Sequence, residues 1–110
     1  MFLLARFMQD SSQSKVHAYV EIYSTPICPY CVRAKSLLKH KDAVFTEYNV
    51  GFDWAARERM VERAYGLRSV PQIFINDRHI GGFDEINELN QRGELDALLA
   101  EPPPPAKATP

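Results

Sequence analysis

Two cysteines, Cys28 and Cys31, stand three positions apart and are the only cysteines in the sequence. This spacing brings both sulfurs to one end of a helix, close enough to form a disulfide. The preceding run, residues 18–23, has the pattern of a strand, and Pro29 suits the first turn of the helix that follows. A Cys-x-x-Cys pair between a strand and a helix predicts a thiol–disulfide redox centre.

The position of Cys28 favours its thiolate, which is the form that attacks a disulfide. A free cysteine has a pKa of ~8.5 and is mostly protonated at neutral pH. Just before a helix, unpaired backbone N–H groups and the positive end of the helix dipole stabilise an anion, so we expect Cys28 to be more acidic than a free cysteine. Cys31 lies one turn further on, facing the core. We therefore assign the attack to Cys28 and the resolving step to Cys31.

Two other roles for this pair fit the sequence less well. A structural disulfide, or a pair of inert core cysteines, would not normally stand at a strand-to-helix turn behind Pro26. A structural zinc site needs about four ligands. The three histidines, His17, His40 and His79, are scattered, and none forms a second pair with ligand spacing. We therefore expect no metal at this pair.

Length and composition indicate one domain. At 45% apolar residues, the 110-residue chain can bury a modest core, and its net charge of -1 gives no sign of nucleic-acid binding. No stretch approaches the ~20 apolar residues of a transmembrane helix. The apolar start, from Met1 to Met8, is interrupted by Arg6 and is shorter than a signal-peptide core. We expect a cytoplasmic monomer, translated from Met1 or Met8, that binds neither membranes nor nucleic acid.

The elements that must position the cysteines follow the order β-α-β-α-β-β-α. Two strands joined by a helix should lie parallel, whereas Asn76 and Asp77, which tolerate positive φ, predict a hairpin and an antiparallel pair. The sequence therefore predicts an α/β fold with a mixed four-stranded sheet flanked by helices. The expected strands are 18–23, 44–50, 72–75 and 78–80, and the expected helices are 29–40, 54–65, 85–92 and 94–100.

Glycine, aspartate and proline mark the ends of these elements. Gly66 is expected to end the second helix in a left-handed conformation, and Asp84 is expected to be the N-cap of the third. The predicted domain spans residues 18–100. Residues 1–17 are expected to form a tail, and residues 101–110, with their run of prolines, a second and disordered one.

With the sequence Cys-Pro-Tyr-Cys at residues 28–31, the chain resembles the dithiol (class I) glutaredoxins. Residues 69–75 resemble the Thr-Val-Pro segment of that family, and residues 81–84 resemble its Gly-Gly-x-Asp segment. The resemblance covers residues 19–99, and the three motifs in this order and spacing are highly specific. It implies a thioredoxin-like fold in which the peptide bond before Pro71 is cis.

The resemblance also implies a glutathione site. Tyr30 would pack along the tripeptide, the Val70 backbone would hydrogen-bond to it, and Phe83 and Asp84 would hold its γ-glutamyl end. Arg57 would bind the glycyl carboxylate. The register of that helix leaves Glu58 or Arg59 at the same spot, and Arg68 is a second basic candidate. The residues that the resemblance assigns to glutathione are Tyr30, Arg57, Ser69, Val70, Pro71, Phe83 and Asp84.

Two positions depart from the family pattern. Many members carry lysine three residues before the first cysteine, where this chain has Thr25, so a positive charge near the thiolate is missing. The family often has cysteine where this chain has Phe83. Four of the assigned residues also have a plainer role. Asp84 can be only a helix cap, Phe83 only core, Tyr30 only packing, and Arg57 only part of a solvated helix face.

The activity that the resemblance implies is glutathione-dependent reduction of protein disulfides and glutathione mixed disulfides. Glutathione would be the reductant, and glutathionylated or disulfide-containing proteins the partners. Three alternatives remain. The first is a redoxin reduced by thioredoxin reductase, which the Gly-Gly-x-Asp segment disfavours. The second is an iron–sulfur cluster carrier that holds the cluster through Cys28 and glutathione, which Pro29 disfavours. The third is a binding module whose cysteines are incidental.

Overall fold

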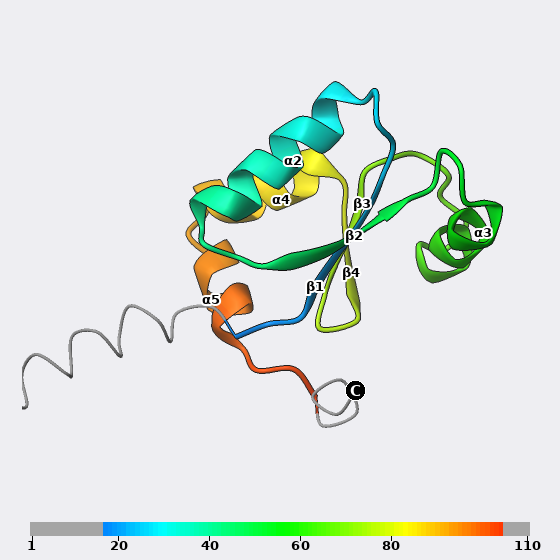
Figure 1. The fold of residues 1–110 in the computed structure, drawn as a ribbon. Helices are drawn as coiled ribbons and strands as arrows, with labels where there is room; N and C mark the ends of the chain where they lie inside the picture. The colour runs from blue at the N-terminus through cyan, green and yellow to red at the C-terminus, as the bar shows by residue number, and fades with distance from the viewer. Residues whose placement is uncertain (1–16, 105–110) are drawn as a thin grey trace, which may run out of the picture.

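Four strands form one mixed sheet, with helices against both of its faces (Figure 1). The computed structural model describes residues 17–104. The spatial order of the strands is β2-β1-β3-β4. In chain order the elements are β1 (Val20–Ser24), α2 (Pro29–His40), β2 (Phe45–Asn49), α3 (Trp54–Arg63), β3 (Gln72–Ile75), β4 (Arg78–Gly81), α4 (Phe83–Gln91) and α5 (Leu95–Ala100).

The pairing of the strands confirms the predicted α/β class and the mixed sheet. β1 and β2, which α2 joins, run parallel, with Val20 opposite Phe45. β1 pairs antiparallel with β3, and β3 pairs antiparallel with β4. The β3–β4 hairpin turns at Asn76 and Asp77, whose φ angles of 52° and 69° match the prediction that both adopt positive φ.

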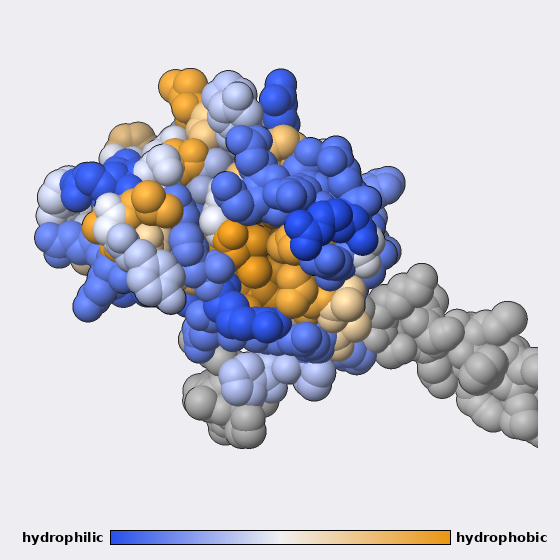
Figure 2. All heavy atoms as spheres, turned by 180° about the vertical axis from the view of Figure 1, so that it is seen from behind, coloured by the Kyte–Doolittle hydropathy of each residue, from blue (hydrophilic) through white to orange (hydrophobic). Residues whose placement is uncertain are grey.

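Each face of the sheet has its own apolar core. On one face, Ile22 of β1 is fully buried against α2, α4 and α5, together with Leu38 and Ile86. On the other face, Phe74 of β3 packs with Met60 of α3. Figure 1 shows α2 and α4 on one side of the sheet and α3 on the other. Figure 2 shows that, on the face opposite to that of Figure 1, apolar residues also gather in a hollow surrounded by hydrophilic residues.

The loops that hold the predicted site residues Cys28, Val70 and Pro71 meet at one end of the sheet. Because β1 and β3 are antiparallel neighbours, the loop after β1 and the loop before β3 lie side by side. The first loop holds Cys28, and the second holds Val70 and Pro71. The antiparallel pairing therefore brings together residues that are 42 positions apart in the sequence.

Two helix ends show what the sequence predicted and what it did not. α2 begins at Pro29, as predicted. α3 ends at Arg63, two residues before the predicted Tyr65, because Tyr65 already has a left-handed φ of 59°. Gly66 follows with the expected positive φ, 93°, and its N–H donates to the Val61 carbonyl at 2.8 Å.

The prediction that Asp84 caps the third of the expected helices is wrong. α4 begins at Phe83, and its N-cap is Gly82. The Glu85 carboxylate reaches back and accepts a hydrogen bond from the Gly82 N–H at 2.8 Å, so the helix end is satisfied two residues earlier. Gly81 makes this possible, because its φ is 120° and a Cβ there would lie 2.9 Å from Glu85 Cγ.

The predicted tails, 1–17 and 101–110, lie largely outside the described residues, so the domain boundaries stay a prediction. The first residues of the second tail are held at the β3–β4 turn. The Asn76 side-chain amide donates to the carbonyls of Glu101 and Pro102 at 3.0 and 3.3 Å. Within residues 17–104, no helix combines the length and apolar character that crossing a membrane requires.

A polar contact fixes the end of β1, just before the cysteine loop. The buried Ser24 hydroxyl donates to the Glu47 carboxylate at 2.6 Å, and the Lys35 ammonium of α2 lies 2.8 Å from the same carboxylate. The hydrogen bond from Lys35 lowers the pKa of Glu47 most, followed by the bond from Ser24. The three side chains therefore tie β1, β2 and α2 together beside the loop that holds Cys28.

This contact predicts a pH dependence of stability. The pKa of Glu47 is lower in the folded chain than its ordinary 4.5, so its contribution is present above pH 4.5 and is lost as pH falls through the folded pKa. We expect Glu47→Gln to weaken the fall in unfolding free energy between about pH 6 and about pH 3. Urea unfolding at several pH values measures it. Glu62→Gln, at an exposed glutamate of α3, is the control, and identical pH profiles for the two variants would contradict the prediction.

Candidate active site

Cys28 and Cys31 form a disulfide at the N-terminus of α2. Their Cα atoms are 5.2 Å apart. Cys28 is the N-cap residue, and its sulfur accepts a hydrogen bond from the Cys31 N–H at 3.1 Å. Cys31 is fully buried, whereas Cys28 is partly exposed. The sequence-based division of roles, with Cys28 as the sulfur that a partner reaches first, fits this difference in exposure.

The loop before β3 lies directly against the cysteine pair. The Val70–Pro71 peptide bond is cis, as the resemblance implied. The Val70 carbonyl oxygen is 3.9 Å from the Cys28 sulfur. We call residues 69–71 the cis-proline loop. Its backbone therefore forms the wall beside the Cys28 sulfur.

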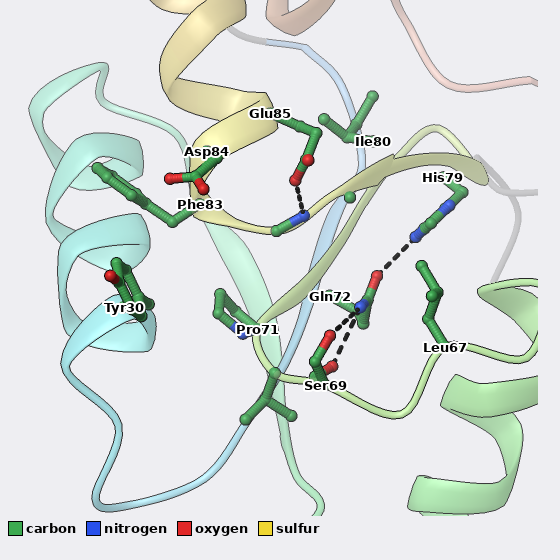
Figure 3. A pocket seen from close by; sticks show the side chains of 13 residues that line it. Tyr30, Leu67, Ser69, Pro71, Gln72, His79, Ile80, Phe83, Asp84 and Glu85 are labelled. Carbon is green, nitrogen blue, oxygen red and sulfur yellow. Dashed lines mark hydrogen bonds between the residues drawn. The ribbon is translucent and has the colours of Figure 1, made fainter.

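A groove of about 450 Å³ runs from Tyr30 along the cis-proline loop to β4 and the start of α4 (Figure 3). We call it the cis-proline groove. Six of the seven residues assigned to glutathione from the sequence line it, and they come from three separate segments of the chain. These six residues are Tyr30, Ser69, Val70, Pro71, Phe83 and Asp84.

Two aromatic rings form one end of the groove. The centroids of Tyr30 and Phe83 are 6.3 Å apart, and the guanidinium of Arg33 lies 5.4 Å from the centroid of the Tyr30 ring. Tyr30 is 53% exposed, so its ring offers free surface to a ligand. Asp84 projects at the same end of the groove, from the first turn of α4 (Figure 3). This end therefore combines apolar surface, a carboxylate and the backbone N–H groups of a helix start.

Arg57 does not line the cis-proline groove. Its guanidinium donates to the Arg68 carbonyl at 3.3 Å. Arg57 and Arg68 instead share a smaller hollow of about 230 Å³ on the outer side of α3, together with Glu58. The two basic candidates from the sequence are thus neighbours, and Arg68 directly precedes Ser69 of the cis-proline loop.

The sequence analysis did not identify the far end of the groove. Gln72 follows Pro71 as a polar residue in an otherwise apolar strand, and that contrast was the one available signal. His79 belongs to a strand that was recognised only as the return of a hairpin. The lining residues that were not assigned are Leu67, Gln72, His79, Ile80, Gly81, Gly82 and Glu85.

At this far end, the surroundings of His79 shift its pKa. Burial lowers the pKa of His79, Arg63 lowers it further, and the charge of Glu85 acts in the opposite direction. The net shift is downward from 6.5, so the imidazole is mainly neutral at neutral pH. In the part of the chain that the structure describes, no cluster of three or more His, Cys, Asp or Glu side chains has an arrangement that could hold a metal ion.

The sequence is similar to known redox proteins over most of its length. The family model described as Glutaredoxin matches residues 20–80. A probable glutaredoxin of Synechocystis is 53% identical over 91 residues, which are 83% of this chain and 84% of that protein. Glutaredoxin 3 of Escherichia coli K12 is 50% identical over 82 residues, which are 74% of this chain and 98% of that protein.

Solved structures agree with this similarity and with the thioredoxin-like fold. The solution structure of glutaredoxin from Brucella melitensis matches with a TM-score of 0.67 and 43% identity, over 78% of this chain and 91% of that one. The crystal structure of a buckwheat glutaredoxin–glutathione complex matches with a TM-score of 0.68 and 27% identity, over 87% and 89%. The family model, the relatives and the cysteine pair at a helix start lead to one conclusion: this chain belongs to the glutaredoxins, the glutathione-dependent thiol–disulfide oxidoreductases.

Proposed function

We propose that this glutaredoxin binds glutathione in the cis-proline groove and exchanges disulfides through Cys28, with Cys31 as the resolving thiol. One observation carries the proposal: residues from α2, the cis-proline loop and α4 line a single groove whose wall lies 3.9 Å from the Cys28 sulfur. A cysteine-containing tripeptide bound along that wall would present its sulfur to Cys28.

The chemistry of the groove suits the ends of glutathione. The backbone of Val70 would pair with the extended peptide, and the ring of Tyr30 would pack along it. Where Tyr30, Phe83 and Asp84 meet, N–H groups in the first turn of α4 suit the α-carboxylate of the γ-glutamyl residue, while the Asp84 carboxylate suits its ammonium. We further assign the glycyl carboxylate to Arg57, with Arg68 as the alternative.

The monothiol route reduces a glutathionylated protein in two exchanges. The Cys28 thiolate attacks the glutathione sulfur of the mixed disulfide, and the substrate leaves as a thiolate that takes up a proton. A second glutathione thiolate then attacks the sulfur of the glutathione bound to Cys28. That disulfide breaks, oxidised glutathione leaves, and the Cys28 thiolate is restored.

The dithiol route reduces a protein disulfide. Cys28 attacks one sulfur of the substrate, which forms a mixed disulfide and releases the other sulfur as a thiol. Cys31 then attacks Cys28, releases the second substrate thiol and leaves the Cys28–Cys31 disulfide. Two glutathione molecules reduce that disulfide and become oxidised glutathione. A monomer in the cytoplasm is sufficient for both routes, and neither route requires a metal, a membrane or a nucleic acid.

The test of the binding site is a Michaelis constant. In a turnover assay coupled to glutathione reductase and NADPH, we expect Asp84→Asn and Arg57→Gln each to raise the KM for the glutathione mixed disulfide by about tenfold, because each removes one charge-assisted contact to its glutathione moiety. The kcat should change little, because neither residue touches the reacting sulfurs.

Matched controls separate this effect from a general loss of charge. Asp42→Asn alters an exposed aspartate after the far end of α2. Arg59→Gln alters an exposed arginine of the same helix as Arg57, and Arg59 lines neither the cis-proline groove nor the hollow beside Arg57. Neither should change KM. An unchanged KM in Asp84→Asn would reject the γ-glutamyl assignment, and an effect of Arg68→Gln without one of Arg57→Gln would transfer the glycyl site to Arg68.

A further inference from the structure

A buried amide connects the cis-proline loop to β4. Gln72 is the first residue of β3 and is only 2% exposed. Its side-chain nitrogen donates to the Ser69 carbonyl at 3.1 Å and to the Ser69 hydroxyl oxygen at 3.3 Å. Its side-chain oxygen is 2.6 Å from Nε2 of His79 (Figure 3). One side chain therefore joins the residue before Val70 to the imidazole of the neighbouring strand.

The direction of these hydrogen bonds follows from their chemistry. A carbonyl oxygen only accepts, so the group of Gln72 that faces the Ser69 carbonyl must be its NH₂. The amide oxygen then faces His79 and can only accept, which requires a proton on Nε2 of the imidazole. The neutral His79 ring is thereby held in its Nε2–H tautomer. No polar atom of the buried amide is left without a partner.

Aromatic side chains hold the imidazole in place. The His79 ring centroid lies 5.1 Å from that of Phe74 and 5.7 Å from that of Tyr65. Phe74 is fully buried in the core beneath α3. Gln72 and Phe74 are two positions apart on β3, so their side chains face the same side of the sheet. His79 is paired with Phe74 on the neighbouring strand and faces that side as well. The imidazole is thus fixed to the core, and the hydrogen bonds of Gln72 connect it to Ser69 of the cis-proline loop.

We propose that His79, acting through Gln72, is a positioning residue that holds the Ser69 carbonyl and thereby sets the Val70 backbone for binding the glutathione moiety of the substrate. The proposal rests on the proposed function, because it assumes that the ligand pairs with Val70. Neither His79 nor Gln72 touches the Cys28–Cys31 disulfide. Their effect therefore acts on binding at the loop and not on the reactivity of the sulfur.

The kinetic test compares variants at both ends of the hydrogen-bond chain. His79→Leu removes the donor to Gln72 and leaves its buried amide oxygen unsatisfied. Gln72→Glu keeps an acceptor for His79 but turns a carboxylate oxygen towards the Ser69 carbonyl. We expect each variant to raise the KM for a glutathione mixed disulfide five- to tenfold, with kcat changed less than twofold.

A conservative variant supplies the rescue that a merely structural role would not give. His79→Gln keeps an N–H donor near the position of Nε2, so its KM should stay within about twofold of the unchanged protein. His40→Leu, at an exposed histidine on the far end of α2, is the matched control. If His79→Gln raises KM as much as His79→Leu does, or if neither changes it, the proposal is overturned.

A spectroscopic measurement tests the same inference without a variant. The imidazole nitrogen shifts of ¹⁵N-histidine-labelled protein distinguish the two neutral tautomers at a pH of about 8. We expect the Nε2–H form for His79, and the Nδ1–H form would overturn the proposal. The Asp84→Asn assay separates this outcome from failure of the glutathione site. If Asp84→Asn raises the KM and His79→Leu does not, only the role of His79 is rejected. If neither variant raises the KM, the glutathione site in the cis-proline groove is rejected as well.

Discussion

Cys28→Ser should lose turnover of a glutathione mixed disulfide by at least about a thousandfold, while Cys31→Ser should keep it. A serine hydroxyl is not ionised at neutral pH and cannot replace the thiolate at the start of α2. Cys31 is fully buried one turn inside the helix, and the monothiol route does not use it. The coupled assay with glutathione reductase and NADPH measures both variants.

The two substrates of that assay separate the roles of the cysteines further. With a protein disulfide as substrate, Cys31→Ser should be impaired as well, because the mixed disulfide on Cys28 then has no internal thiol to resolve it. The opposite pattern, with Cys31→Ser inactive on the mixed disulfide and Cys28→Ser active, would reverse the assignment. If the unchanged protein shows no turnover at saturating glutathione, the proposed route is rejected. Reduction by thioredoxin reductase, or a role as an iron–sulfur cluster carrier, would then be favoured.

Arg63→Met should lower the free energy of unfolding by about 2–4 kcal/mol, because it leaves the buried Glu21 carboxylate without its counter-ion, although the Tyr48 hydroxyl still donates to it at 3.1 Å. Arg63 of α3 makes two hydrogen bonds to Glu21 of β1, at 2.9 and 3.2 Å. The Glu21 side chain is only 4% exposed. Arg63 also donates to the Tyr23 hydroxyl at 2.8 Å, and its guanidinium stacks 4.1 Å from the centroid of the Phe74 ring. We expect a smaller loss of unfolding free energy than for a fully buried ion pair, because the Arg63 side chain is 26% exposed.

Urea unfolding with three variants checks this result. Arg59→Met removes an exposed arginine from the same helix and should change stability by no more than about 0.5 kcal/mol. Adding Glu21→Gln to Arg63→Met replaces the unpaired charge with a neutral amide and should recover part of the loss. A loss below about 1 kcal/mol in Arg63→Met would mean that water or another group compensates the Glu21 carboxylate.

The sequence was sufficient for the features that depend on neighbouring residues. Cys28 and Cys31 are one helical turn apart, so their pairing needs only a helix start, and Pro29 marks that start. Asn76 and Asp77 form the predicted turn because both tolerate the positive φ that a two-residue hairpin requires. The resemblance to the glutaredoxins supplied the cis bond before Pro71, which the spacing of residues alone does not give.

Helix boundaries were less predictable because they depend on competition between caps. Asp84 is a good N-cap by residue type, but Glu85 satisfies the Gly82 N–H from inside the helix and moves the start of α4 to Phe83. The carboxylate of Asp84 is thereby left free at the groove instead of bound to its own helix. Similarly, the left-handed conformation of Tyr65 ended α3 early, and residue type does not favour that conformation in tyrosine.

The sequence by itself determined the redox pair, the order of strands and helices, and the family. Only the tertiary structure decided that Arg57 lies outside the cis-proline groove. It also decided that Arg63 pairs with Glu21, 42 positions away in the sequence, and that Gln72 joins Ser69 to His79. The physical reason is that local periodicity and turn chemistry act over a few residues, whereas these contacts depend on strand register and helix packing. A register shift between Ile73 and Phe74 in the β3–β4 pair, for example, places His79 opposite Phe74, and no local pattern encodes it.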